Sequence, residues 1–297
     1  MAFAAKNKNN RWLEYTLYVV LVGLVLLYLI FPAQEVEDLV DNSVSRVNPE
    51  LGFKAVKISP WLPPGLRING GRIFLGNAAG PTVFAVDTIY IRPQILKLLS
   101  GKYNVKLTGT AYKGDINGSL RLGDEDGNTF ESEWFFEALD ISAFDLLTEE
   151  LQHKLTGMFS GNVVFARDSA SEAGNGRANL KLIDGKLLFE NPVFGIDSVD
   201  LQNIVLELEL QNHKVTIIKG ELKGPELNAA LAGSIQLHSD VKKSQLNLKG
   251  TLEPLPEFYR KYPEIRELLK SMKKRVKRGQ YFFAITGTLS QPRFRML

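Results

Sequence analysis

The three histidines, His153, His213 and His238, are the side chains best suited to acid–base chemistry near neutral pH. None of them belongs to an HExxH pattern, and the chain has neither a Gly-x-Ser-x-Gly nucleophile motif nor a phosphate-binding loop. The chain contains no cysteine, which excludes disulfides, thiolate metal sites and a cysteine nucleophile. We therefore predict that each histidine is a surface residue, with His153 near a helix end, His213 in a turn and His238 at a strand end.

Two groups of acidic residues invite a metal-binding or acid–base interpretation. Glu207 and Glu209 alternate with leucines, so both carboxylates lie on one side of a strand, and we interpret that side as solvated. Residues 123–128, GDEDGN, lack the ligand spacing of a twelve-residue calcium loop and are typical of a hairpin turn. The sequence thus predicts a protein that is not an enzyme and that uses no metal or cofactor.

A cluster of cations ends an amphipathic helical segment that we expect over residues 254–278, as one helix or as two pieces joined near Pro263. Cations near a helix C-terminus favour the helix dipole, which is the plainer interpretation. The same cluster could contact anionic lipid or an acidic partner. Its members are Lys270, Lys273, Lys274, Arg275, Lys277 and Arg278.

Several segments alternate apolar and polar residues and carry a glycine on the apolar side. Period two with one apolar side predicts strands of a half-buried antiparallel sheet. The residues that carry this pattern are Val105, Leu107 and Gly109; Phe159, Gly161 and Val163; Leu231, Gly233 and Ile235; Leu246, Leu248 and Gly250; and Phe283, Ile285 and Gly287.

Two architectures fit that alternation. Glycine within a strand marks a bulge, a bend or a close approach to the backbone. A glycine on the apolar side of strand after strand would curve the sheet around that side and form an apolar groove. The alternative is a sandwich, in which the glycines meet bulky residues of a second sheet. Few helices are expected, so either the sheet folds over on itself or something else, such as lipid, covers its apolar side.

The elements that position these residues are mostly strands. The period changes from helical to alternating near Pro49, and turn residues separate the later segments. We expect short helices at 34–48, 93–102 and 142–155, the last with Ser142 or Asp145 as its N-cap. Strands are predicted at 51–59, 66–76, 82–92, 103–114, 116–122, 129–139, 158–167, 177–189, 196–210, 214–223, 227–238, 244–252, 281–290 and 292–297.

A single long apolar run, residues 15–31, precedes all of these elements. It has no charge, and its length is near the lower limit of about 17–25 residues that a membrane-spanning helix needs. A cleaved signal peptide is the alternative, but Phe31 and Pro32 are unsuitable beside a cleavage site. The residues expected to form the anchor are Tyr15, Tyr18, Leu21, Leu24, Leu27 and Phe31.

Charges on either side of this run predict its orientation. Lys6, Lys8 and Arg11 precede it, and acidic residues follow it, so the N-terminus is expected on the cytoplasmic side. We therefore predict a cytoplasmic tail at 1–14, a transmembrane helix at 15–31 and a β-rich domain at 32–297. The simplest location for that domain is the periplasmic face of a bacterial inner membrane. The net charge of +3 is too small to suggest a nucleic-acid partner.

The order of segments resembles the AsmA-like proteins of bacterial envelopes. The resemblance rests on the apolar run and the helix after it, then on LGFKAVKIS with WLPPGLRI, RPQILKLLSGK, LTGTAYKGDINGSL and the closing FFAITGTLSQPRF. In size, single span and layout the chain is most similar to the GspN family of type II secretion proteins. The resemblance implies a mainly β protein, with an N-terminal transmembrane helix followed by a long, curved, mostly antiparallel sheet. It also favours the groove over the sandwich.

The resemblance also implies a function. A member of the GspN family would be a non-enzymatic, inner-membrane component that supports protein export by binding other envelope proteins of the type II secretion system. The wider AsmA-like group implies the alternative, a module that binds or transfers lipid in an apolar β-groove. The expected partners are accordingly the inner membrane, other secretion proteins and phospholipid. The family supplies no catalytic residues.

Overall fold

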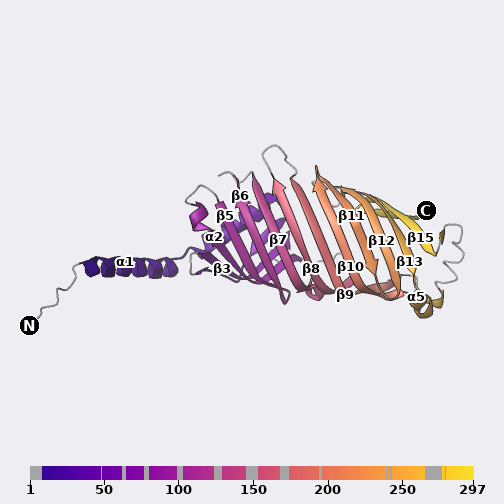
Figure 1. Ribbon diagram of the computed structural model, residues 1–297, viewed down its shortest axis with the longest axis horizontal. Coiled ribbons are helices and arrows are strands. Elements are labelled where there is room, and N and C mark those ends of the chain that lie inside the picture. Colours follow the sequence, from indigo (N-terminus) through magenta and orange to yellow (C-terminus); the bar gives the residue numbers. More distant parts are fainter. Residues whose placement is uncertain are drawn as a thin grey trace, which may run out of the picture.

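Over the described residues the chain forms one long sheet with a helix projecting from its N-terminal end (Figure 1). The computed structural model describes residues 9–47, 49–61, 65–76, 80–98, 103–123, 129–144, 153–167, 174–193, 196–238, 240, 243–264, 276–277 and 279–297. The helices are α1 Asn9–Leu29, α2 Ala33–Val47, α3 Ile95–Leu98, the 3₁₀ turn η1 Ile141–Ala143, and α5 Pro256–Lys261. The strands are β1 Leu51–Lys54, β2 Lys57–Trp61, β3 Gly65–Leu75, β4 Thr82–Pro93, β5 Tyr103–Ala111, β6 Gly114–Leu122, β7 Phe130–Asp140, β8 His153–Arg167, β9 Asn175–Val193, β10 Ile196–Gln211, β11 Lys214–Lys223, β12 Leu227–Gln236, β13 Gln245–Pro254, β14 Val276–Lys277, β15 Gln280–Thr288 and β16 Pro292–Met296.

Almost every strand pairs with its neighbour in the chain. The order across the sheet is β1-β3-β4-β5-β6-β7-β8-β9-β10-β11-β12-β13-β15-β14, with β2 beside β3 and β16 beside β15. Every pairing between these strands is antiparallel. The prediction of a mainly β protein, built on one long antiparallel sheet with a few short helices, is confirmed.

Tight hairpins explain why the strands follow one another in order. Tyr112 and Lys113 join β5 to β6, and Asn212 and His213 join β10 to β11. All four residues have positive φ angles, between 49° and 63°. Two consecutive residues of this kind make the turn whose twist matches that of antiparallel strands, so each pair sends the chain straight back along its neighbour. His213 lies in a turn, as the sequence predicts.

The first predicted strand is two strands. The chain breaks its alternation at Ala55 and Val56, between β1 and β2. The side chain of Val56 is 85% exposed, and its N–H donates to the carbonyl oxygens of Asn69 and Gly70 on β3. Gly70 has a φ of 59°, which only glycine adopts readily, and a side chain there would meet Val56. This local bulge divides the predicted strand at 51–59.

The predicted helix at 142–155 is shorter than expected. We expected His153 to Leu155 to end this helix. These three residues instead begin β8, because they pair in antiparallel register with Phe189 to Leu187 on β9. His153 is therefore in a strand, not at a helix end. The N-cap is also a different residue from the predicted Ser142. Asp140 accepts a hydrogen bond from the Ser142 N–H and caps the short 3₁₀ turn η1. Asp145, the other predicted cap, lies outside the described residues.

The segment 254–278 is likewise only partly helical. Pro254 belongs to β13, and α5 covers Pro256–Lys261. Val276–Lys277 forms β14 and pairs with β15, so the helical prediction is wrong there. A cross-strand partner, invisible to the local pattern, decides this conformation.

Helix α2 lies along the first edge strand, β1. Asp41 Oδ1 accepts from the Phe53 N–H at 2.5 Å, and Glu37 Oε1 accepts from the Ala55 N–H at 3.1 Å. Edge strands present unpaired backbone groups that recruit other strands. Here two carboxylates of α2 occupy such groups, so this end of the sheet is partly closed to further pairing.

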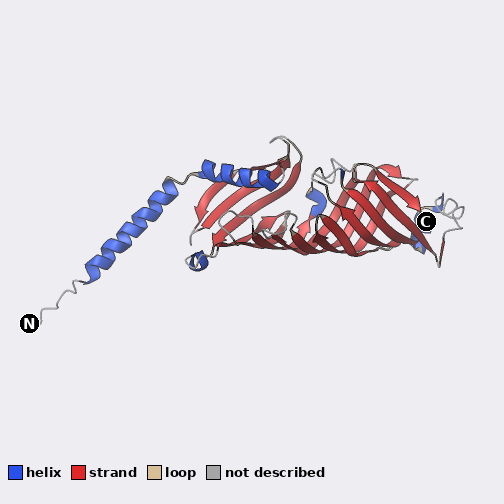
Figure 2. Ribbon diagram, turned by 90° about the horizontal axis from the view of Figure 1, so that it is seen from above, coloured by secondary structure: helices blue, strands red, loops and turns tan. Residues whose placement is uncertain are grey.

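Helix α1 contains most of the predicted anchor and points away from the sheet (Figure 2). Tyr15, Tyr18 and Leu21 are exposed on it. Leu24 and Leu27 lie in the helix, but their side chains are outside the description, and Phe31 follows the helix half-buried. Within the described part of the chain, no helix combines the length and the apolar character that crossing a membrane requires.

Candidate apolar groove

A continuous row of apolar residues and glycines crosses the sheet from β2 to β16. Directly opposed residues in an antiparallel sheet project from the same face, so the register follows the row from strand to strand. At about 4.8 Å between strands, the row is about 60 Å long. Its members are Pro60, Leu66, Ile91, Leu107, Gly118, Trp134, Val163, Ala178, Leu208, Ile217, Gly233, Leu248, Ile285 and Phe294.

We call the face that carries this row the inner face. All fifteen predicted groove residues project from it, because each is either in the row or two or four positions from a row member on β5, β8, β12, β13 or β15. The opposite, outer face is polar. Its neighbouring row reads Arg92, Lys106, Ser119, Glu133, Val164, Arg177, Glu209, Thr216, Ser234, Asn247, Thr286 and Arg293.

Two glycines of the inner face lie close to the backbone of the neighbouring strand. A methyl group on Gly109 would collide with the Thr88 carbonyl oxygen of β4, and one on Gly233 with the Asn247 carbonyl oxygen of β13. The neighbouring backbone therefore leans over the inner face at these positions. Gly233 also has a φ of 136°, a conformation that other residues rarely adopt. These contacts are the close approach of neighbouring backbone that a glycine within a strand permits.

Among the residues that the structure describes, no second sheet covers the inner face. From Leu66 on β3 to Leu208 on β10, the members of the row are half-buried rather than buried. Only Ile217 and Leu248, each 7% exposed, are buried members of the row. The described strands belong to one sheet, so they do not form the sandwich that the sequence left open.

An apolar pocket of about 480 Å³ lies on the inner face beside η1. Three neighbouring strands, β8, β9 and β10, form its floor. A smaller hollow of about 140 Å³, which includes Val163, Phe165 and Leu208, lies further along the same strands. The large pocket is lined by Ile141, Phe144, Leu155, Phe159, Leu180, Lys181, Leu182, Ile204 and Leu206.

A capped turn fixes one rim of this pocket. Asp140 accepts hydrogen bonds from Lys113 Nζ at 2.8 Å and from Ser142. These bonds, the one from Lys113 first, lower the pKa of Asp140 from its ordinary 3.8 to about 2. The turn places Ile141 and Phe144 over the strands, and the Phe144 ring lies 5.0 Å from that of Tyr112.

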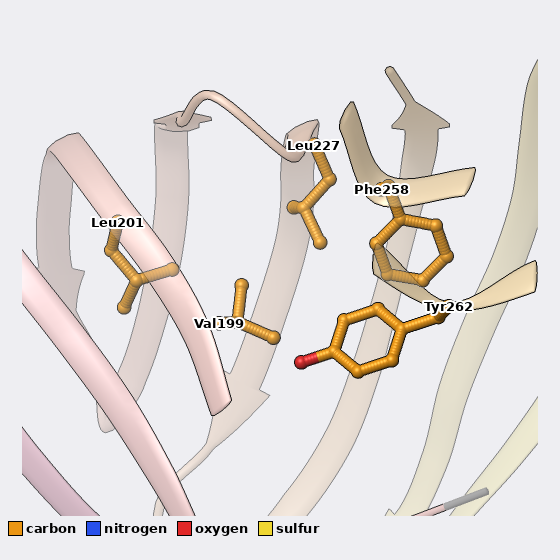
Figure 3. Packing of buried hydrophobic residues seen from close by; sticks show 5 residues of the cluster. All are labelled: Val199, Leu201, Leu227, Phe258 and Tyr262. Carbon is orange, nitrogen blue, oxygen red and sulfur yellow. The ribbon is translucent and has the colours of Figure 1, made fainter. Parts of the chain in front are cut away.

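Helix α5 covers the inner face at another place. Phe258 and Tyr262 pack on Val199, Leu201 and Leu227, and all five side chains are at most 9% exposed. Figure 3 shows these side chains pointing toward one another. Leu155 and Ile204 pack against this cluster and also line the pocket, so the cluster and the pocket adjoin.

Polar contacts hold α5 in place. Lys261 Nζ lies 2.6 Å from Glu226 Oε1, whose side chain is 3% exposed. Burial lowers the pKa of Lys261, but the hydrogen bond and charge of Glu226, together with Tyr262, outweigh it and raise the pKa above its ordinary value. The Tyr262 hydroxyl donates to the Ser198 carbonyl at 2.6 Å and to Asp197, and this bond lowers the pKa of Asp197.

The residues tested for catalysis do not converge. Glu207 and Glu209 lie on the outer face, where Glu209 accepts from Arg177. His238 follows β12, and its Nδ1 accepts from the Asp240 N–H. Within the described ranges, no three His, Asp or Glu residues lie close enough together to hold a metal ion.

Other predicted features fall outside the description. Most of the proposed turn at 123–128 is not described. Among the basic residues, Lys277 lies in β14, and its side chain is not described. The other five, Lys270, Lys273, Lys274, Arg275 and Arg278, lie outside the described residues.

Three details of the groove were not predicted from the sequence: the Asp140 cap of η1, the first residue of α5, and the ion pair that holds α5. The Asp140-x-Ser142 pattern is a local capping signal for η1 that could have been recognised. Pro256 in the first turn of α5 is a start signal for that helix. Glu226 carries no local signal, because its partner Lys261 is distant in sequence.

No protein-family model, curated protein or solved structure matches this chain.

Proposed function

We propose that the protein holds the acyl chains of lipids on its inner face and acts by binding rather than by catalysis. The apolar row that crosses the whole sheet without a charged residue carries this proposal. The adjoining pocket of about 480 Å³ supports it, since ligand pockets commonly measure about 300–1,000 Å³. Covering apolar surface is worth about 25 cal/mol per Å², so an apolar occupant would stabilise this face.

In this proposal α1 is an N-terminal transmembrane helix that anchors the sheet on the periplasmic side of a bacterial inner membrane. Its 21 residues extend about 31 Å at about 1.5 Å per residue, close to the thickness of a hydrocarbon core. Leu17, Val19 and Leu21 on this helix are exposed, which suits lipid better than water. Alkaline extraction should leave the full chain in the membrane pellet, and its release would contradict the anchor.

A photoreactive phospholipid tests the acyl-chain site. The full chain in its membrane is exposed to a phospholipid with a diazirine in one acyl chain, irradiated and digested, and adducts are mapped by mass spectrometry. We expect adducts on β8, β9 and β10 as well as on α1. Adducts confined to α1 would agree with the membrane anchor but contradict lipid binding in the groove.

A second candidate is a component of the type II secretion system that binds other envelope proteins. The order of elements favours it, because α1, α2, the first strands and α3 follow one another in the order on which the GspN resemblance rests. Deleting the gene should then impair export of secreted enzymes without slowing growth. Unchanged export would exclude this role and would not bear on lipid binding.

A further inference from the structure

The outer face carries an apolar hollow near the end of the sheet farthest from α1, away from the proposed lipid site. The hollow has a volume of about 380 Å³ and lies across β11, β12, β13 and β15. Ile218 and Leu297 at its rim are 57% and 40% exposed. It is lined by Ile218, Lys219, Gly220, Glu221, Ala230, Leu231, Ala232, Lys249, Gly250, Thr251, Phe282 and Leu297.

A bulge and a set of small residues produce this hollow. The register between β10 and β11 shifts at Ile218, so this residue is extra and leaves the regular alternation. Ala230 and Ala232 on the next strand occupy little space, which leaves a depression beside the exposed isoleucine. An apolar depression on a mainly polar face is typical of a surface that contacts another protein.

The charges around the hollow are unbalanced at one point. Lys219 lies 3.6 Å from Glu221, so these two charges offset each other. Lys249 is exposed, and its cross-strand neighbours are Ala232 and Ala284, which carry no charge. A carboxylate that a partner places beside Lys249 would therefore add a favourable electrostatic contact.

We infer that this hollow docks a protein partner that inserts one apolar side chain and presents an acidic side chain to Lys249. An apolar anchor in a small pocket with a charge at its rim is a common arrangement of binding hot spots. The site lies on the face opposite the groove, so a test of lipid binding does not decide whether this docking site exists.

Photo-crosslinking in the cells that make the protein tests this inference. The full chain carries p-benzoylphenylalanine in place of Ile218, and a matched chain carries it in place of Phe135. Phe135 is 48% exposed and projects from the same face, because it pairs with Asn162, which lies two positions from the outer-row residue Val164. We expect Ile218, but not Phe135, to give one protein adduct whose cross-linked peptide contains an apolar residue close to Asp or Glu.

Charge reversal gives the second arm of this test. Lys249→Glu should reduce the Ile218 adduct about tenfold by opposing the partner's acidic side chain. Lys106→Glu, at an exposed position on the outer face of β5, should leave it unchanged. A lipid adduct, an adduct within or between copies of this chain, or equal labelling from Phe135 would overturn the inference. Insensitivity of the adduct to Lys249→Glu would do the same.

Discussion

Adjacent valines on β8 provide a matched test of the groove. Val163 belongs to the inner row and is half-buried, whereas Val164 belongs to the outer row and is 40% exposed. Val163→Asp introduces a carboxylate where an acyl chain would lie. Val164→Asp makes the same chemical change between Glu133 and Arg177 on the polar face. Only the first substitution should weaken lipid binding.

The size of the effect follows from the partial burial of Val163. Fully burying a valine side chain is worth about 1.5–3 kcal/mol, and only part of this remains for the lipid to contribute. The buried carboxylate adds a desolvation cost. A net loss of about 1–2 kcal/mol corresponds to a reduction of about 5- to 30-fold in lipid occupancy.

The readout is the yield of photoreactive-phospholipid adducts on β8 to β10, measured for full-length proteins at equal amounts in membranes. Adducts on α1 serve as the internal reference. Thermal unfolding of each variant checks that it is folded. Equal adduct yields in folded Val163→Asp and wild type, or an equal loss in Val164→Asp, would refute the assignment of the inner face to lipid.

Three further experiments test what holds the groove together. Lys261→Met should lower the free energy of unfolding by about 1–3 kcal/mol in chemical denaturation, because it leaves the buried Glu226 carboxylate uncompensated, and adding Glu226→Gln should recover part of the loss. Gly109→Ala should destabilise the protein by about 1–3 kcal/mol through its collision with neighbouring backbone, whereas Gly23→Ala, with no atom within 4 Å, should not. The lowered pKa of Asp140, about 2, makes its stabilisation present above pH 4 and lost as the pH falls toward 2, so the melting temperature of wild type should fall more over that range than that of Asp140→Asn.

The sheet could be predicted from sequence because each strand encodes its own face. Leu246, Leu248 and Gly250 alternate with polar residues, so their common side follows from the pleat alone. The glycines mark places where neighbouring strands approach closely, since a side chain at Gly109 would meet the adjacent strand. Short hairpins then bring the strands together in chain order.

The departures from prediction come from contacts between distant residues. His153 to Leu155 have a helix-compatible sequence, yet pairing with β9 makes them a strand. Val276 and Lys277 pair with β15 in the same way. The local sequence pattern carries no information about such distant partners. For the same reason it predicts neither the ion pair of Lys261 with Glu226 nor the bulge at Ile218.

Contact between lipid acyl chains and the inner face can be measured directly by fluorescence quenching. The chain has no cysteine, so Leu208→Cys and Val164→Cys each permit one fluorescent label, on the inner and the outer face respectively. The full-length proteins are reconstituted with phospholipids brominated on the acyl chains. The groove predicts strong quenching of the label at position 208 and little at position 164. Equal quenching at both positions, or none at 208, would contradict it.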